Sequence, residues 1–191
     1  MKQSIRVECF ETNSSSYHTI TIKKLSEKPK IKDIEIGKET EITGVINKRC
    51  IGDTSSYLYT SLNKLDKANM LVRYFGYEFD DWLYSEEIYI KFKGMTDDEK
   101  KEKVLEFAYE FSYYKAIVEC ISNYTGCKTI LKPSKNRYWS SLFNCVSDDG
   151  MSIETILGIN SSTTHEELVE KFNNIIFDDD YVIIEECESN E

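Results

Sequence analysis

Apolar and polar side chains alternate along segments near the two ends of the chain. Residues 4–10 carry an apolar side chain at every second position, and residues 17–24 repeat the alternation through Ile20 and Ile22. A period of two is the spacing of a half-buried β-strand, because neighbouring side chains point to opposite faces. Further short segments are expected to be strands: residues 31–36, 41–46, 128–132, 138–146 and 181–185.

The centre of the chain has helical spacing instead. Thr96 and Glu99 have the spacing of a capping box, in which the threonine hydroxyl accepts from the Glu99 amide and the glutamate reaches back. The apolar positions that follow form one stripe of a helix, and Gly126 is placed to end it. This pattern predicts one long helix over about residues 97–124.

More helices are expected on either side of the long one. Apolar residues between 58 and 75 recur at helical spacing, with Ser55 or Ser56 as the N-cap and Gly76 just past the end. Two shorter helices are expected nearer the C-terminus: residues 152–157, ending at Gly158, and a helix opened by a second capping box at Thr164 and Glu167.

Strands at both ends around a helical middle predict an α+β fold with a mostly antiparallel sheet that uses the N- and C-terminal strands. The chain has 191 residues, which is within the usual size of one domain, so residues 1–191 are taken as a single domain. Its hydrophobic fraction of 40% and charged fraction of 30% are those of an ordinary globular protein.

The cysteines and the N-terminus indicate a reducing compartment. The six cysteines include no Cys-x-x-Cys pair and no zinc-type Cys/His cluster, so we expect all of them to be reduced. They are Cys9, Cys50, Cys120, Cys127, Cys145 and Cys187. The first residues have no apolar signal region, and no apolar run approaches the ~20 residues that cross a bilayer. We therefore expect a cytoplasmic protein that does not bind a membrane.

Negative charge is concentrated at the C-terminal end. The net charge is −10, and residues 141–191 contain Lys171 as their one basic residue against thirteen Asp and Glu. Because such a surface repels phosphate backbones, non-specific binding to nucleic acid is disfavoured. Carboxylates at 178–180 could ligate a divalent cation, but no EF-hand spacing is present, and an acidic turn explains them. We expect no metal and no cofactor.

One polar loop between the first two expected strands could carry chemistry. Its candidate ligand-binding residues are Asn13, Ser14, Ser15, Ser16 and His18. Serine hydroxyls and successive amides can form a nest for a phosphate, and His18 is the one candidate for a catalytic base. The same residues are equally typical of a solvent-exposed turn, with His18 paired across a hairpin. His165 does not complete a two-histidine phosphodiesterase, because two glutamates follow it.

The segment Glu11-Thr12-Asn13-Ser14-Ser15-Ser16-x-His18, entered from a strand and followed by Thr-Ile-Thr-Ile, resembles the opening of a group of small proteins. These proteins come from bacteriophages and mobile elements of low-GC Gram-positive bacteria. The similarity covers about residues 5–22, and the group brings no activity that could be transferred. The resemblance implies that the protein acts inside the host cell of such an element. Its compartment would then be the host cytoplasm.

Two functions from different classes follow from these observations. The first is a phage or mobile-element accessory protein that binds a host factor, such as a defence or regulatory protein, with its acidity steering the association. The second is a nucleotide- or phosphate-binding protein, or a phosphodiesterase, that uses the loop from Asn13 to His18. The aromatic middle of the chain, with Trp82 and many tyrosines, could anchor a protein interface or rim the core. The sequence does not determine the oligomeric state.

Overall fold

The computed structural model describes residues 16–24, 34–44, 49–50, 56–61, 63–132, 143, 153–179 and 181–189. For four strands the structure describes the backbone: β1 (Ser16–Lys24), β3 (Arg49–Cys50), β4 (Ser56–Ser61) and β6 (Tyr181–Ser189). Among their side chains it describes that of Ile183, which is buried. The strand expected over residues 4–10 lies outside the described residues, as does the one over 138–146 apart from Phe143.

Helices cover more than twice as many described residues as strands. They are α1 (Lys64–Tyr74), α2 (Gly76–Leu83), α3 (Glu86–Tyr89), the 3₁₀ helix η1 (Ile90–Phe92), α4 (Asp97–Glu110), α5 (Ser112–Thr125), α6 (Ile153–Leu157) and α7 (His165–Phe177). Most of the buried apolar side chains also belong to helices. The expected fold class, an α+β fold with a mostly antiparallel sheet, is therefore wrong: the described chain is mostly helical, and its core is mainly helix packed on helix.

The strands form two separate sheets. The larger sheet has the strand order β1-β6-β4-β3, and all of its neighbouring strands are antiparallel. The other sheet is parallel and pairs β2 (Thr40–Ile42) with β5 (Thr129–Leu131). Residues 34–36, the described part of the strand expected over 31–36, are not a strand, because the chain turns there around Gly37 at a φ of 81°.

The helix expected over residues 58–75 begins later than its apolar spacing indicates. Residues 56–61 are strand β4, which pairs with β6, so neither Ser55 nor Ser56 is the N-cap. Asn63 caps α1 instead, and its side chain accepts from the amide of Asp66 at 2.7 Å. Tyrosine and threonine suit a strand, and the neighbouring β6 satisfies the backbone groups of this segment. Gly76, which was expected to end this helix, is instead the first residue of α2.

The single long helix expected over residues 97–124 is two helices. Phe111 adopts an extended conformation, with φ −65° and ψ 123°, between α4 and α5. Its ring packs against Phe79 and Tyr114 at centroid distances of 5.2 Å each. The break therefore turns the chain so that α4 and α5 each bury their apolar side, and no glycine or proline marks it.

The two predicted capping boxes and the predicted end of a helix at Gly126 are confirmed. Thr96 and Glu99 form both hydrogen bonds of the first capping box, and Thr164 and Glu167 form both of the second. α5 ends at Gly126, whose left-handed φ of 67° suits a residue without a Cβ atom.

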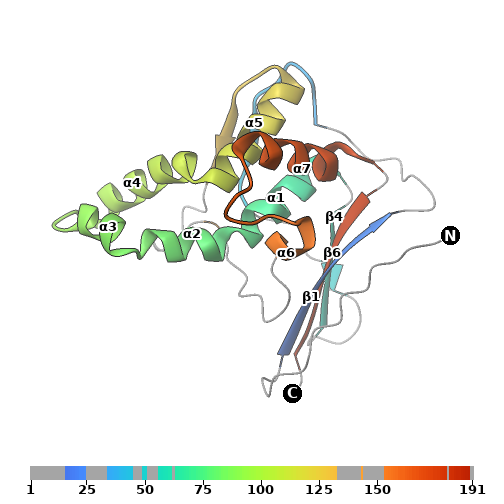
Figure 1. Ribbon diagram of the computed structural model, residues 1–191, viewed down its shortest axis with the longest axis horizontal. Coiled ribbons are helices and arrows are strands. Elements are labelled where there is room, and N and C mark those ends of the chain that lie inside the picture. The colour runs from blue at the N-terminus through green and yellow to red at the C-terminus, as the bar shows by residue number, and fades with distance from the viewer. Residues whose placement is uncertain are drawn as a thin grey trace.

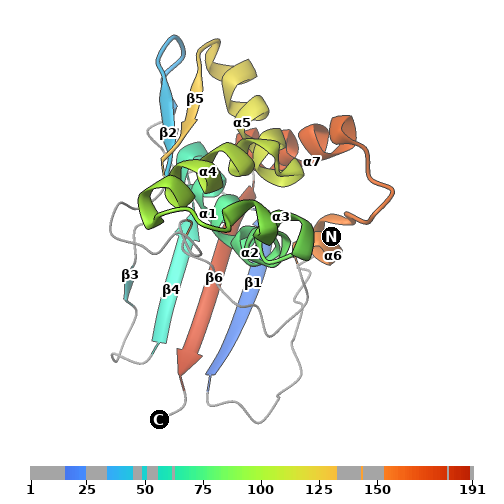
Figure 2. The same cartoon turned by 90° about the vertical axis from the view of Figure 1, so that its left-hand side faces the viewer.

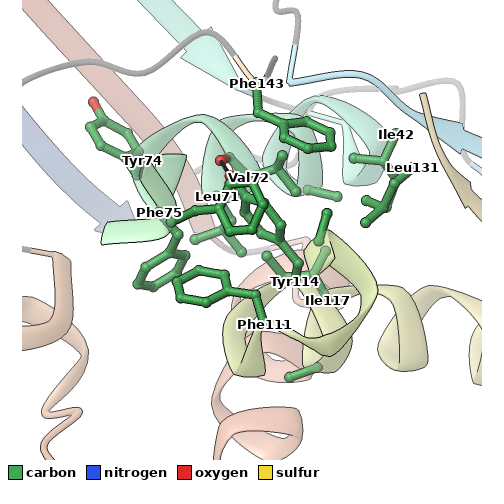
Figure 3. Packing of buried hydrophobic residues seen from close by; sticks show 14 of the residues in the cluster. Ile42, Leu71, Val72, Tyr74, Phe75, Phe111, Tyr114, Ile117, Leu131 and Phe143 are labelled. Atoms are coloured by element: carbon green, nitrogen blue, oxygen red, sulfur yellow. Dashed lines mark hydrogen bonds between the residues drawn. The ribbon is translucent and has the colours of Figure 1, made fainter. Parts of the chain in front are cut away.

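The centre of the molecule is a packed layer between α1, α5 and the small parallel sheet. Figure 3 shows Leu71 and Val72 of α1 facing Tyr114 and Ile117 of α5, with Ile42 and Leu131 from the strands beside them. Tyr114 is fully buried, and its hydroxyl donates to the carbonyl of Val72 at 3.0 Å. A buried tyrosine requires such a partner, so this hydrogen bond ties α5 to α1.

The helices α2, α3, η1 and α4 form an arm that projects away from the rest of the molecule. In Figure 1 the chain leaves the centre along α2, turns at α3 and returns along α4, with the larger sheet on the opposite side of the molecule. Figure 2 looks at this arm from its end, and α1 lies between the arm and strands β4 and β6. We call residues 76–110 the helical arm.

Candidate functional site

The structure places two of the five residues predicted to bind a ligand. Ser16 and His18 lie in β1, where they stand opposite Ser189 and Cys187 of β6. Asn13, Ser14 and Ser15 lie outside the described residues. A ligand site in this loop, and a catalytic role for His18, therefore stay predictions from the sequence.

His165 and Asp179, both considered from the sequence, connect elements of the fold. His165 Nε2 lies 2.8 Å from Glu119 Oε2 and joins the start of α7 to α5. Lys64 of α1 reaches Asp179 Oδ1 at 3.1 Å, just beyond the end of α7. Within the described part of the chain, no group of three or more His, Cys, Asp or Glu side chains could hold a metal ion.

Aromatic side chains pack between the outgoing and returning helices along the length of the helical arm. Trp82 packs edge-on against Phe107 with the ring centroids 5.8 Å apart, and Phe92, near the tip, packs edge-on against the same ring at 5.8 Å. At the base, Phe79 of α2 contacts Phe111, where α4 ends, at 5.2 Å. These contacts hold the outgoing and returning helices together, so the tip is presented on a rigid support.

The helical arm carries four exposed large apolar side chains. Tyr77, Tyr84, Tyr89 and Ile90 are exposed by 51%, 53%, 54% and 62%. Tyr84 and Tyr89 stack on each other with their ring centroids 6.4 Å apart. We call these four residues the arm patch. Although the sequence indicates an aromatic middle, its pattern does not distinguish these tyrosines from buried ones such as Tyr114, because both kinds lie in helices or directly beside them.

The helical arm carries more acidic than basic residues, and charges of both signs lie beside the arm patch. The arm contains eleven Asp and Glu against five Lys. Glu86 and Glu87 are exposed next to the patch, and Lys91 and Lys93 are exposed on its other side along the chain. The arm therefore combines exposed apolar side chains with a net negative charge, which suits a partner with an apolar cleft and basic side chains.

A pocket of about 450 Å³ opens between the last turns of α5 and α7. Cys120 is buried in its wall, and its thiol donates to the carbonyl of Val169 at 3.3 Å. Burial raises the pKa of the Cys120 thiol to about 12, and the Glu119 carboxylate adds to this rise. Cys120 is therefore a neutral thiol at physiological pH and is not an activated nucleophile.

Alkylation should reveal the protection of Cys120. At about pH 8.5, iodoacetamide is expected to modify Cys120 roughly two to three orders of magnitude more slowly in the folded protein than in urea, because little thiolate forms. Mass-spectrometric mapping would measure both rates, with the half-buried Cys127 as an internal control that reacts faster in the folded protein. Since the thiolate is disfavoured in the folded state, this group stabilises the fold below about pH 9 and loses that effect as the pH rises towards 12. Equal rates with and without urea would contradict the buried position.

Comparisons with known proteins give no relative from which an activity could be transferred. No family model, no curated protein and no solved structure matches the chain. Among the described residues, no helix is both long and apolar enough to span a bilayer.

Proposed function

We propose that this protein is an accessory protein of a phage or mobile element that binds a host protein through the arm patch. The observation that carries the proposal is the exposure of three tyrosines and one isoleucine on a rigid helical projection. Aromatic residues contribute large contact area at low entropic cost and are enriched among the residues that dominate binding energy at interfaces. The resemblance of residues 5–22 to phage and mobile-element proteins supports a host partner in the cytoplasm, such as a defence or regulatory protein.

Rigidity of the arm favours binding of this kind. A partner does not have to order the patch, because Phe79, Trp82 and Phe107 already hold its helices together. Less conformational entropy is then lost on association. The acidic residues of the arm favour a host protein with a basic surface, such as one that handles nucleic acid, and would raise the association rate at low salt.

The triple variant Tyr84→Ser, Tyr89→Ser, Ile90→Ser is expected to lose the host partner. Each change removes an exposed apolar side chain, so the fold should remain, while affinity for the partner should fall at least about tenfold. The measurement is quantitative affinity purification of host proteins on the immobilised full-length chain, followed by titration of the enriched protein. Circular dichroism would verify that the variant is folded.

Ile36→Ser is the matched control, since Ile36 is 73% exposed on a turn outside the arm. A partner that depends on the arm patch should bind this control as it binds the wild type. If the triple variant and the wild type recover the same proteins in equal amounts, the arm patch is not the binding surface. Association that does not weaken with added salt would contradict the role of the acidic residues.

A further inference from the structure

The pocket between α5 and α7 has a chemical character of its own, and it is separate from the arm patch. In Figure 1 these two helices lie side by side, and the pocket is formed where both of them end. Its lining consists of three carboxamides, two aromatic rings, a thiol and a carboxylate: Asn123, Asn173, Asn174, Tyr124, Phe177, Cys120 and Asp178.

The electrostatics of this lining disfavour anions. None of the lining residues is cationic. The C-terminal ends of two helices supply partial negative charge, and neither helix has a basic residue in its last turn. Asp178 adds a carboxylate, and the asparagine side chains offer carbonyl oxygens as acceptors. The lining therefore favours a cation with N–H donors over an anion such as phosphate.

The aromatic part of the wall suits a planar cation. Tyr124 and Phe177 stack with ring centroids 4.4 Å apart and make one continuous apolar wall. The chain already places a cation of its own against this wall: Lys64 Nζ lies 5.8 Å from the centre of the Tyr124 ring and pairs with Asp179. Lys67 Nζ is buried behind the end of α7 and donates to the carbonyl of Asp178 at 2.8 Å. Lys64 therefore binds an oxygen outside the pocket lining, whereas Lys67 binds the backbone carbonyl of Asp178, a lining residue.

We propose that this pocket binds a guanidinium group, supplied by an arginine side chain or by a small free guanidinium compound. A guanidinium has five N–H donors in a plane, is weakly hydrated and stacks on aromatic faces. These properties match carboxamide and carboxylate oxygens beside a Tyr–Phe wall. The buried Cys120 thiol is compatible with the assignment, because it lines the pocket without adding a charge. The proposal does not depend on the arm patch or on its partner.

Comparison of two isosteric probes tests the charge requirement. L-arginine amide should bind the full-length protein at low salt, whereas L-citrulline amide, which has the same shape with a neutral urea group, should bind at least about tenfold more weakly. Isothermal titration calorimetry would measure both. Equal binding of the two probes, or no binding of arginine amide, would overturn the proposal.

Opposite changes at one exposed position distinguish a site from a structural effect. Asn174 is an exposed lining residue, so both Asn174→Asp and Asn174→Lys should fold. The added carboxylate should tighten binding of arginine amide by about three- to tenfold, and the added ammonium should weaken it by a similar factor. Changes in the same direction, or no change in either variant, would show that the probe binds elsewhere.

The source of the guanidinium can be decided with a peptide. Tighter binding of acetyl-Ala-Arg-Ala-amide than of agmatine would support an arginine of a protein, and the reverse order would support a small free cation. Either order is compatible with the pocket as a guanidinium site, provided that Asn174→Lys weakens the tighter ligand. Binding that is the same in Asn174→Lys and in the wild type would overturn the assignment.

Discussion

Replacing Phe79 with alanine is expected to lower the free energy of unfolding by about 3–5 kcal/mol. Phe79 is 1% exposed and connects the helical arm to the rest of the fold. Its ring packs against the rings of Phe111, Tyr114 and Phe143 at centroid distances of 5.2, 5.0 and 6.0 Å. Truncation would leave a cavity at the point where α2 and the break between α4 and α5 meet, so these contacts would be lost together.

Urea unfolding followed by circular dichroism would measure this effect. Tyr77→Ala is the matched control because Tyr77 lies on the same helix and is 51% exposed. Its unfolding free energy should change by about 0.5 kcal/mol or less. If the two variants were equally stable, Phe79 would not occupy the core position described here, and the arm would have to be held to the molecule in another way.

Asn69→Ala is expected to cost about 2–4 kcal/mol, because one side chain satisfies two backbone amides. Asn69 Oδ1 accepts from the amide of Thr43 at 2.8 Å and from that of Gly44 at 3.0 Å. Asn69 is 5% exposed on α1, so it ties the end of β2 to that helix. Alanine would leave both N–H groups without this acceptor in a largely buried place.

Two measurements would test this role of Asn69. Urea unfolding gives the loss of stability, and hydrogen exchange should show faster exchange at the amides of Thr43 and Gly44. Asn123→Ala is the control: Asn123 is an exposed asparagine on α5, where alanine has the higher helix propensity. A loss of stability in Asn69→Ala no greater than in Asn123→Ala would contradict the proposed anchoring of β2.

Local chemistry made several helix ends predictable. The capping boxes at Thr96 and Thr164 are satisfied within four residues of chain, so they form wherever the surrounding fold places them. Gly126 ends α5 for an equally local reason, its left-handed backbone conformation. The strand expected over residues 17–24 corresponds to β1, because its period of two also needs no distant information to be recognised.

The candidate sites were less predictable than these ends. The sequence directed attention to the polar loop of Asn13 to His18, whose function stays a prediction. It contained the tyrosines of the arm patch but no sign of their exposure, because Tyr84 and Tyr114 have similar helical surroundings in the sequence. The α5–α7 pocket brings Asn123 next to Asn173 and Asn174, about 50 residues further along the chain. Sequence spacing gives no measure of such proximity.

The sequence alone determined the two capping boxes, the helix end at Gly126, the order of most segments and the concentration of acid near the C-terminus, since each depends on neighbouring residues or on composition. The tertiary structure decided the remainder. Phe111 breaks a continuous apolar stripe because its ring packs against Phe79, and residues 56–61 become a strand because β6 lies beside them. Both outcomes are set by contacts between segments that are distant in the chain, ring packing for Phe111 and backbone pairing for residues 56–61, and helical spacing of apolar residues does not reveal either contact.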